Sequence, residues 1–188
     1  MYYMTNYDSP IGQLTLASDG VHLVGLWMKD QKYFGGAIKL ELASGKVVSE
    51  DKLPVFYMVK DWLDRYFAGE KPEIMELSLS PAGSDFRQEV WKLLCEIPYG
   101  EVTTYGAIAA KMAEKLQKKT MSAQAVGGAV GHNPISIIIP CHRLVGANGS
   151  LTGYAGGVEK KIRLLELEGV DVSVFTVPGK GILNEKRQ

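Results

Sequence analysis

The chain has 188 residues, of which 46% are hydrophobic and 22% are charged, as in an ordinary soluble globular protein. This composition excludes disordered, collagen-like and coiled-coil chains, and the length predicts one domain or a small pair with a buried core. No run reaches the roughly 18 consecutive apolar residues of a membrane-spanning helix, and residues 1–6 lack the features of a signal peptide. We therefore expect no membrane association and a cytoplasmic location.

Cysteine and histidine are too few for several kinds of site. The sequence has two cysteines, Cys95 and Cys141, and three histidines, which excludes a disulfide framework and a zinc site built on cysteines. We expect neither a metal nor a cofactor.

The charges balance over the whole chain but not within its halves. Residues 1–80 carry 8 Lys and Arg against 11 Asp and Glu, whereas residues 81–188 carry 13 against 10. A basic second half permits a nucleic-acid partner, although a solvated lysine face fits the same counts.

The first 80 residues predict strands followed by a helix. Residues 12–18 and 21–28 alternate polar and apolar side chains around the turn Asp19-Gly20, which predicts a hairpin. Residues 54–67 have apolar side chains at helical spacing, begin with Pro54 and end before Ala68-Gly69, as a helix does. Residues 74–79 alternate again and predict a returning strand, whereas residues 29–53 have no clear pattern.

The second half is mostly helical in pattern. Residues 85–96, 104–115 and 122–131 predict three helices, with Ser122 as an N-cap and Cys95 as a packed apolar residue. The second and third could form a helix-turn-helix, although many helical domains contain such a pair. Residues 137–139 predict a short buried strand that Pro140 ends. The last helix is expected at 158–167 with Gly169 as its C′ residue, before a tail that contains Pro178-Gly179-Lys180-Gly181.

Cys141 and His142 are neighbours after this buried run. Adjacent side chains usually point apart in an extended chain, so we expect a bridging water between the thiol and the imidazole rather than a direct pair. A free thiol has a pKa of about 8.5 and is mostly protonated at neutral pH, so a reactive cysteine needs activation. From these residue types alone, a buried structural cysteine is as good an interpretation as a reactive one.

The run Ile138-Ile139-Pro140-Cys141-His142-Arg143 strongly resembles the active-site signature of the O6-alkylguanine-DNA alkyltransferases. The likeness continues in one order over about residues 84–170, whereas residues 1–80 match only loosely. It includes the helix-turn-helix entry at 98–106, the recognition helix at 125–129 with its following turn at 133–134, the substrate loop at 153–157 and the terminal helix at 164–169.

The resemblance implies an α/β fold in two domains. Residues 1–80 would form a small N-terminal α/β sheet domain, ribonuclease-H-like, and residues 81–170 a mostly α-helical alkyltransferase domain with the helix-turn-helix. Residues 171–188 would be a C-terminal tail. The implied activity is DNA repair, in which Cys141 takes the alkyl group from O6-alkylguanine or O4-alkylthymine once and irreversibly. The implied partner is double-stranded DNA bearing the lesion, and we expect a monomer with no obligate protein partner.

The same resemblance assigns the site residues. His142 would deprotonate Cys141 through a water, and Glu168 would orient His142. Tyr105 would donate a proton to the leaving base. The remaining substrate contacts would be Asn133, which braces the turn, Leu144, Tyr154, the backbone N–H of Ala155 facing O6, and Gly156. Without the resemblance, Tyr105 fits a packing residue, Glu168 an exposed helix-end glutamate and Asn133 a simple turn residue.

A base must leave the duplex before a protein pocket can reach its O6. The predicted helix at 122–131 is unusually rich in glycine and alanine, which indicates close approach either to a DNA backbone or to another helix. The resemblance places Thr104, Ser122, Gln124, Ala125, Gly127 and Gly128 at the DNA. Relatives usually have an arginine at the position of Gln124. Because glutamine offers amide hydrogen bonds but no charge, we expect slower or weaker base flipping here.

Three other classes of protein remain as alternatives. A non-catalytic damage binder of the same fold would lack the cysteine, and a methyl-sensing regulator would have a second cysteine cluster near the N-terminus. A cysteine hydrolase would need a direct contact between Cys141 and His142, which their adjacency disfavours.

Overall fold

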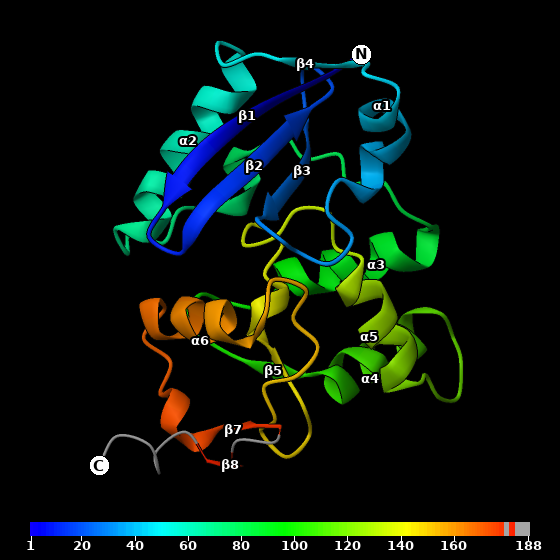
Figure 1. The fold of residues 1–188 in the computed structure, drawn as a ribbon. Helices are drawn as coiled ribbons and strands as arrows, with labels where there is room; N and C mark the ends of the chain where they lie inside the picture. Colours follow the sequence, from blue (N-terminus) through cyan, green and yellow to red (C-terminus); the bar gives the residue numbers. More distant parts are fainter. Residues whose placement is uncertain (179–180, 183–188) are drawn as a thin grey trace.

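A computed structural model describes residues 1–178 and 181–182 of the chain. Figure 1 shows a sheet at the top, with helix α2 on one side and α1 on the other, above a cluster of helices that carries the C-terminal half. The predicted mixed α/β class, with an N-terminal sheet and a helical C-terminal part, is confirmed.

The sheet has the order β3-β2-β1-β4, in which β1 and β4 are parallel and the other pairs antiparallel. The predicted hairpin is confirmed as β2 (Gly12–Ser18) and β3 (Leu23–Met28). Residues 21–22 belong to its turn, because the Asp19 carboxylate accepts hydrogen bonds from both of their backbone N–H groups. Strands β1 (Tyr2–Ser9) and β4 (Val47–Ser49) were not predicted.

Both faces of the sheet are covered. Helix α2 (Pro54–Phe67), which matches the prediction, buries six side chains. Its face packs into a core with Leu14 and Leu16, whereas Ala17, Val24 and Trp27 pack with Ile38 in a separate cluster. Ile38 ends the short 3-10 turn η1 (Gly36–Ile38), which precedes α1 (Lys39–Ala43). The alternation of side chains along each strand thus supplies two apolar faces.

The strand predicted at 74–79 is wrong. Residues Ile74–Glu76 form a 3-10 turn, η2, in which the side chains of Glu73 and Glu76 bond each other's backbone N–H groups. This local capping box competes with pairing in a sheet. Only Leu79 makes a bridge, to Leu23 at the edge strand β3.

The four helices predicted in the second half are confirmed as α3 (Asp85–Cys95), α4 (Tyr105–Lys115), α5 (Ala123–Gly131) and α6 (Val158–Leu167). Ser122 is the predicted N-cap, since its hydroxyl accepts from the N–H groups of Gln124 and Ala125. Gly169 follows the last helix with a φ of 80°, as a C′ glycine does.

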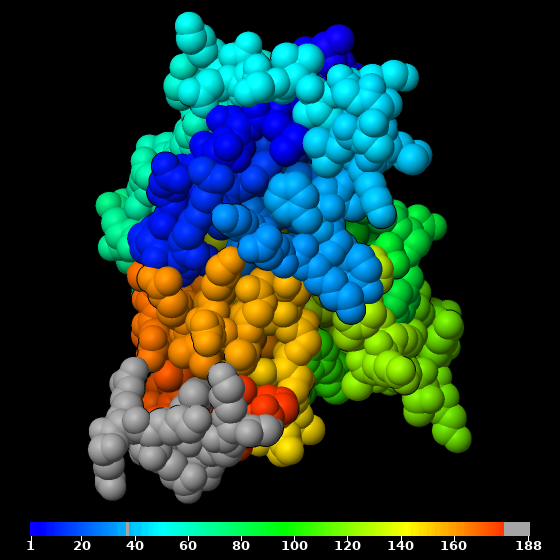
Figure 2. All heavy atoms as spheres, in the orientation of Figure 1, coloured from blue at the N-terminus to red at the C-terminus, as the bar shows by residue number. Residues whose placement is uncertain are grey.

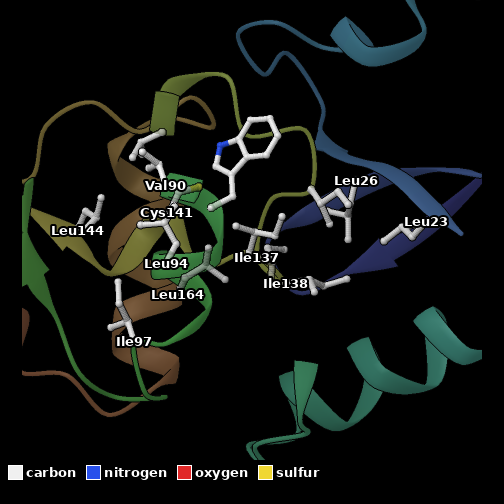
Figure 3. Close-up of a cluster of buried hydrophobic side chains, with 14 of the residues drawn as sticks. Leu23, Leu26, Val90, Leu94, Ile97, Ile137, Ile138, Cys141, Leu144 and Leu164 are labelled. Carbon is white, nitrogen blue, oxygen red and sulfur yellow. The ribbon is translucent and has the colours of Figure 1, made fainter. Parts of the chain in front are cut away.

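The strand predicted at 137–139 is also wrong. Ile137 has a φ of 70° and the segment forms a tight turn, in which Ile139 N donates to Ile135 O. The residue that pairs with the sheet is Ile135, which bridges to Leu26 of β3. Figure 3 shows Ile137 and Ile138 between Leu26 and Cys141. A β-branched apolar run marks burial equally well in a turn.

Short pairings complete the second half. Strand β5 (Thr103–Thr104) is parallel to β6 (Leu144–Val145), which follows the 3-10 turn η3 (Cys141–Arg143). After the 3-10 turn η4 (Val172–Val174), strand β7 (Thr176–Val177) pairs with β8 (Gly181–Ile182). Phe175 and Val177 are buried beside Leu165 of α6. Residues 179–180 of the tail's Pro-Gly-Lys-Gly run and the polar end at 183–188 lie outside the described residues.

Candidate active site

Cys141 lies in the turn η3 with 4% of its surface exposed. The side chain of Asn133 holds this turn, because its Nδ2 donates to Ile139 O at 2.9 Å and to Cys141 Sγ at 3.2 Å. Its Oδ1 accepts from Ile135 N at 3.0 Å. Asn133 therefore fixes the backbone before Pro140, at Ile135 and Ile139, and offers the Cys141 sulfur a donor.

The Cys141 thiol needs help to ionise. Burial raises its pKa, although the hydrogen bond from Asn133 and the positive charge of Lys161 both act in the opposite direction. Since desolvation disfavours the charged form of a buried thiol, the resting group is protonated at neutral pH. A base nearby is required to make it a nucleophile.

His142 is suited to be that base. Its side chain is fully buried, and Nε2 lies 2.6 Å from Glu168 Oε1. Burial lowers the pKa of His142, and the bond to Glu168 opposes this. Because an ionised carboxylate only accepts, Nε2 carries the proton and Nδ1 keeps a lone pair. Nδ1 is buried with no hydrogen-bond partner among the described residues.

Glu168 is the centre of the buried polar network. Its Oε1 accepts from His142, from the Tyr66 hydroxyl at 2.7 Å and from Arg143 Nη2 at 3.0 Å. Its Oε2 accepts from Arg143 Nε at 2.9 Å and from Gly100 N at 3.1 Å. Burial alone would raise the pKa of Glu168, but the bonds from His142 and Arg143 hold it well below its usual value. The carboxylate is therefore ionised.

Lys161 is a buried cation whose charge acts on the Cys141 sulfur. It has no exposed surface, and its Nζ donates to the backbone oxygens of Leu144 and Thr152. Burial lowers its pKa to about 8, and the charge of Cys141 acts to raise it. The positive charge on this ammonium favours the thiolate form of Cys141.

The loop at 153–157 packs against Tyr105 and, through Tyr154 and Gly156, against Met28. The Tyr105 hydroxyl donates to Thr152 O at 3.1 Å, and a Cβ on Gly153 would lie 2.9 Å from that hydroxyl. Burial, and then the charge of Cys141, raises the pKa of Tyr105 to about 12. Tyr154 points toward Met28, and its hydroxyl lies 3.9 Å from the Met28 sulfur. A Cβ on Gly156 would clash with the side chains of Met28 and Tyr154.

Residues of the first 80 contact this loop from one side. Ala155 O accepts from Lys32 N at 3.1 Å, and Lys160 Nζ donates to Lys29 O at 3.3 Å. Figure 2 shows the corresponding blue and orange surfaces in contact. The side chain of Leu144 is wholly buried in the core beside Cys141, as Figure 3 shows.

The remaining predicted contacts lie at the N-cap of α4 and along α5, from its N-cap Ser122 to Gly128. Thr104 caps α4 by accepting from Ala107 N. Ser122, Gln124, Ala125 and Gly128 are exposed, and Gly127 is half-buried. A Cβ at Gly128 would meet nothing within 4 Å, and one at Gly127 only the Tyr105 ring at 3.9 Å. Close helix packing therefore does not require these glycines.

Three residues of the network were not predicted as site residues: Tyr66, Arg143 and Lys161. Arg143 belongs to the signature run without an assigned role. Lys161 lies on the apolar face of the predicted helix with Leu164 and Leu165, and Glu168 follows on the same side. A lysine is unusual on such a face, so this position was a signal in the sequence that was missed. Tyr66 lies on the apolar face of α2, but nothing in its local sequence identifies its partner.

Two further absences hold for the described residues. No group of His, Cys, Asp and Glu side chains is placed to hold a metal ion. No helix among them has the length and apolar character needed to cross a membrane.

Cys95 is half-buried against the core as predicted, and burial raises its pKa to about 11.

Comparison with known proteins gives consistent matches. Family models of 6-O-methylguanine DNA methyltransferase match residues 1–81 (ribonuclease-like domain) and 85–170 (DNA binding domain). Methylated-DNA–protein-cysteine methyltransferases from Haemophilus influenzae and Mycobacterium bovis are 41% and 45% identical over 168 residues, with 89% of this chain and 87% and 93% of theirs covered. The crystal structure of Mycobacterium tuberculosis OGT in complex with DNA matches with a TM-score of 0.75 at 44% identity, covering 89% of this chain and 93% of that one.

Proposed function

This chain belongs to the family of methylated-DNA–protein-cysteine methyltransferases, and we propose that it repairs DNA by moving the alkyl group of O6-alkylguanine, or of O4-alkylthymine, onto Cys141. The observation that carries the proposal is the buried Cys141 sulfur, bonded by Asn133 and preceding a histidine whose other nitrogen is fixed by Glu168. If Cys141 were only a structural cysteine, the buried polar network around it would have no role in a reaction.

The transfer itself is a displacement at saturated carbon. The Cys141 thiolate forms a C–S bond to the alkyl carbon while the bond from that carbon to the base oxygen breaks, and the electron pair stays with the base. The thioether product has no route back to the thiol, so each molecule acts once. Lys161 and Asn133 stabilise the thiolate before attack.

His142 would take the thiol proton through a bridging water. Its Nδ1 is the free ring nitrogen in the tautomer that Glu168 selects, and Glu168 stabilises the imidazolium that forms. A direct hydrogen bond between sulfur and imidazole, as in a cysteine hydrolase, is not required.

The leaving base becomes negative as the bond breaks, so a proton donor beside it lowers the barrier. We assign this role to the Tyr105 hydroxyl. Tyr154 and Gly156 would line the alkyl pocket, with Leu144 supporting it from the core, and the N–H of Ala155 would face O6. Relatives often have serine at the position of Ala155, so only the backbone donor is expected here.

Double-stranded DNA bearing the lesion is the proposed partner. The exposed, slim face of α5 supports close approach of a phosphate backbone or minor groove by Ala125, Gly127 and Gly128. The capped starts of α4 at Thr104 and α5 at Ser122 would position backbone N–H groups toward phosphates. Gln124 would enter the gap left by the flipped base.

Other features of the protein are proposed on the same basis. We expect a cytoplasmic monomer that acts without an obligate protein partner and without a cofactor. We also propose the division into residues 1–80, residues 81–170 and the tail at 171–188.

Intact mass measurement after incubation with duplex DNA carrying O6-methylguanine tests the proposal. We expect one added CH2 unit per molecule, located at Cys141 by peptide mapping, and no transfer with Cys141→Ser. An unchanged mass, or an adduct elsewhere, would overturn the assignment.

A further inference from the structure

One member of the buried network lies far from the other members in the sequence. Tyr66 lies in the last turn of α2, 102 residues before Glu168, and 1% of its surface is exposed. Its hydroxyl is 2.7 Å from Glu168 Oε1 and 3.5 Å from His142 Nε2. The helix that covers the N-terminal sheet therefore ends at the atom that orients the histidine.

The Tyr66 hydroxyl can only be a donor in this contact. Burial, and then the negative charge of Glu168, raises the pKa of Tyr66 well above its usual value. The carboxylate accepts, so the hydroxyl proton points at Oε1. A hydrogen bond to a charged acceptor is among the stronger kinds.

The position of this hydroxyl is set by aromatic packing. The Tyr66 ring stacks on Trp62 at 5.4 Å and meets Phe67 and Tyr99 edge-on at 5.2 and 5.9 Å. Trp62 is held in turn by a hydrogen bond from its Nε1 to Glu73 O. Three rings therefore fix where the hydroxyl lies, with little freedom to follow a displaced carboxylate.

Glu168 Oε1 divides its charge among three donors: Tyr66, His142 and Arg143 Nη2. Removing one donor leaves more negative charge for the other two, which strengthens the hold on the His142 proton. The other charged or titratable groups facing Glu168 and His142 are Arg143 from η3, Lys161 from α6, Cys141, Tyr99 and Tyr154.

We propose that Tyr66 is a positioning residue for alkyl transfer, whose hydroxyl fixes the Glu168 carboxylate and so sets the orientation and basicity of His142. The first 80 residues thereby complete the active site of the second part of the chain. This inference rests on the proposed function, because the histidine matters only if Cys141 reacts.

Tyr66→Phe tests the role and Tyr99→Phe is its matched control. Phe keeps the ring and its packing in both variants. The Tyr99 hydroxyl also bonds at the end of α6, to Leu167 O at 3.2 Å, but it does not bond the carboxylate. The two variants thus differ in whether Glu168 loses a donor.

The assay is the single-turnover rate of transfer from saturating O6-methylguanine duplex, followed across the pH range. For Tyr66→Phe we expect a rate lower by on the order of tenfold, with DNA affinity unchanged. The acid limb of the profile should move to higher pH, because His142 holds its proton more tightly. Tyr99→Phe should leave that limb in place. An unmoved limb in Tyr66→Phe, or equal changes in both variants, would overturn the proposal.

A second readout does not depend on chemistry. The His142 imidazole can be titrated by NMR in Cys141→Ser protein with and without Tyr66→Phe, and its pKa should rise in the variant. An unchanged His142 pKa overturns the inference even if transfer occurs, whereas wild-type protein that fails to transfer overturns the proposed function alone. Should Tyr66→Phe not fold, Tyr66→Met takes its place, and failure of both to fold would assign Tyr66 to the core only.

Discussion

Replacing Lys161 by methionine should make the protein more stable and less reactive. Lys161 is wholly buried, and burial lowers its pKa from 10.5 to about 8. This difference corresponds to a cost of about 3 kcal/mol for keeping the side chain charged in the folded protein. Methionine has a similar length and no charge, so Lys161→Met removes that cost.

The substitution also removes the two hydrogen bonds that Lys161 makes. Thr152 O keeps its bond from Tyr105, whereas Leu144 O loses the ammonium. An acceptor left without a partner in the interior costs about 1–3 kcal/mol. The free energy of unfolding should therefore rise by about 1 kcal/mol at neutral pH, from the difference between the two terms.

The pH dependence of this gain has a definite sign. Between about pH 8 and about pH 10.5 the unfolded wild-type chain holds the Lys161 proton while the folded protein loses it, so wild-type stability rises with pH. The advantage of Lys161→Met should shrink through this window and reverse above it. Urea unfolding of both proteins at several pH values, each carrying Cys141→Ser so that the coupled thiol does not titrate, measures the difference. A difference independent of pH would refute the reasoning.

The reactivity of the same variant should fall. The ammonium lowers the pKa of the Cys141 thiol, so its loss leaves less thiolate. We expect a transfer rate lower by about tenfold near neutral pH, which is the effect of one pKa unit. A variant that is destabilised and fully active would contradict both parts of the prediction.

Three more predictions concern other residues of the site. Gln124→Arg should raise the transfer rate on duplex DNA more than on a free-base substrate and steepen the salt dependence of DNA binding; equal gains on both substrates would count against a role in base flipping. Asn133→Ala should lower the melting temperature and the rate together, because Ile135 N loses its partner at about 1–3 kcal/mol and the Cys141 sulfur loses a donor, whereas Ile139 O keeps its bond from Cys141 N; wild-type kinetics would show that the turn needs no brace. Glu168→Gln should destabilise the protein at neutral pH, and the difference should shrink progressively as pH falls below about 4, since a carboxylate with a lowered pKa contributes its full stability above the unfolded value and loses it between that value and the folded one. Acid and neutral urea titrations measure this, and a constant difference would be the contrary result.

The contacts between the two parts of the chain suggest why the N-terminal part is retained. Lys32 bonds the loop at 153–157 through Ala155 O, and Tyr66 bonds Glu168. Ser136, in the turn that leads to Cys141, donates to Gln31 at 3.0 Å. The sheet and α2 thus support the turn that carries Cys141, the loop at 153–157 and the hydrogen-bond network of Glu168.

Features that depend on neighbours in sequence were predicted correctly. The four helices of the second half follow from apolar spacing and from caps such as Ser122 and Gly169, which act within one turn of the chain. The β2–β3 hairpin follows from alternation around Asp19-Gly20. The signature around Cys141 identified the family, because that run of residues is specific in itself.

The errors at 74–79 and 137–139 have a common cause. Both runs are apolar enough to be mostly buried, but burial alone does not choose between a strand and a turn. A capping box decided the first, and docking of Ile135 on β3 decided the second. These outcomes depend on which surface each segment meets.

The amino-acid sequence by itself determined the helices, the hairpin and the pairing of Cys141 with His142 in one signature run, since each is encoded by residues close together in the chain. Only the tertiary structure decided that Tyr66, Arg143 and Lys161 surround that pair, because their partners lie far away in sequence. Charge and proton affinity in a buried site depend on distance and desolvation, and no local pattern of residues carries either quantity.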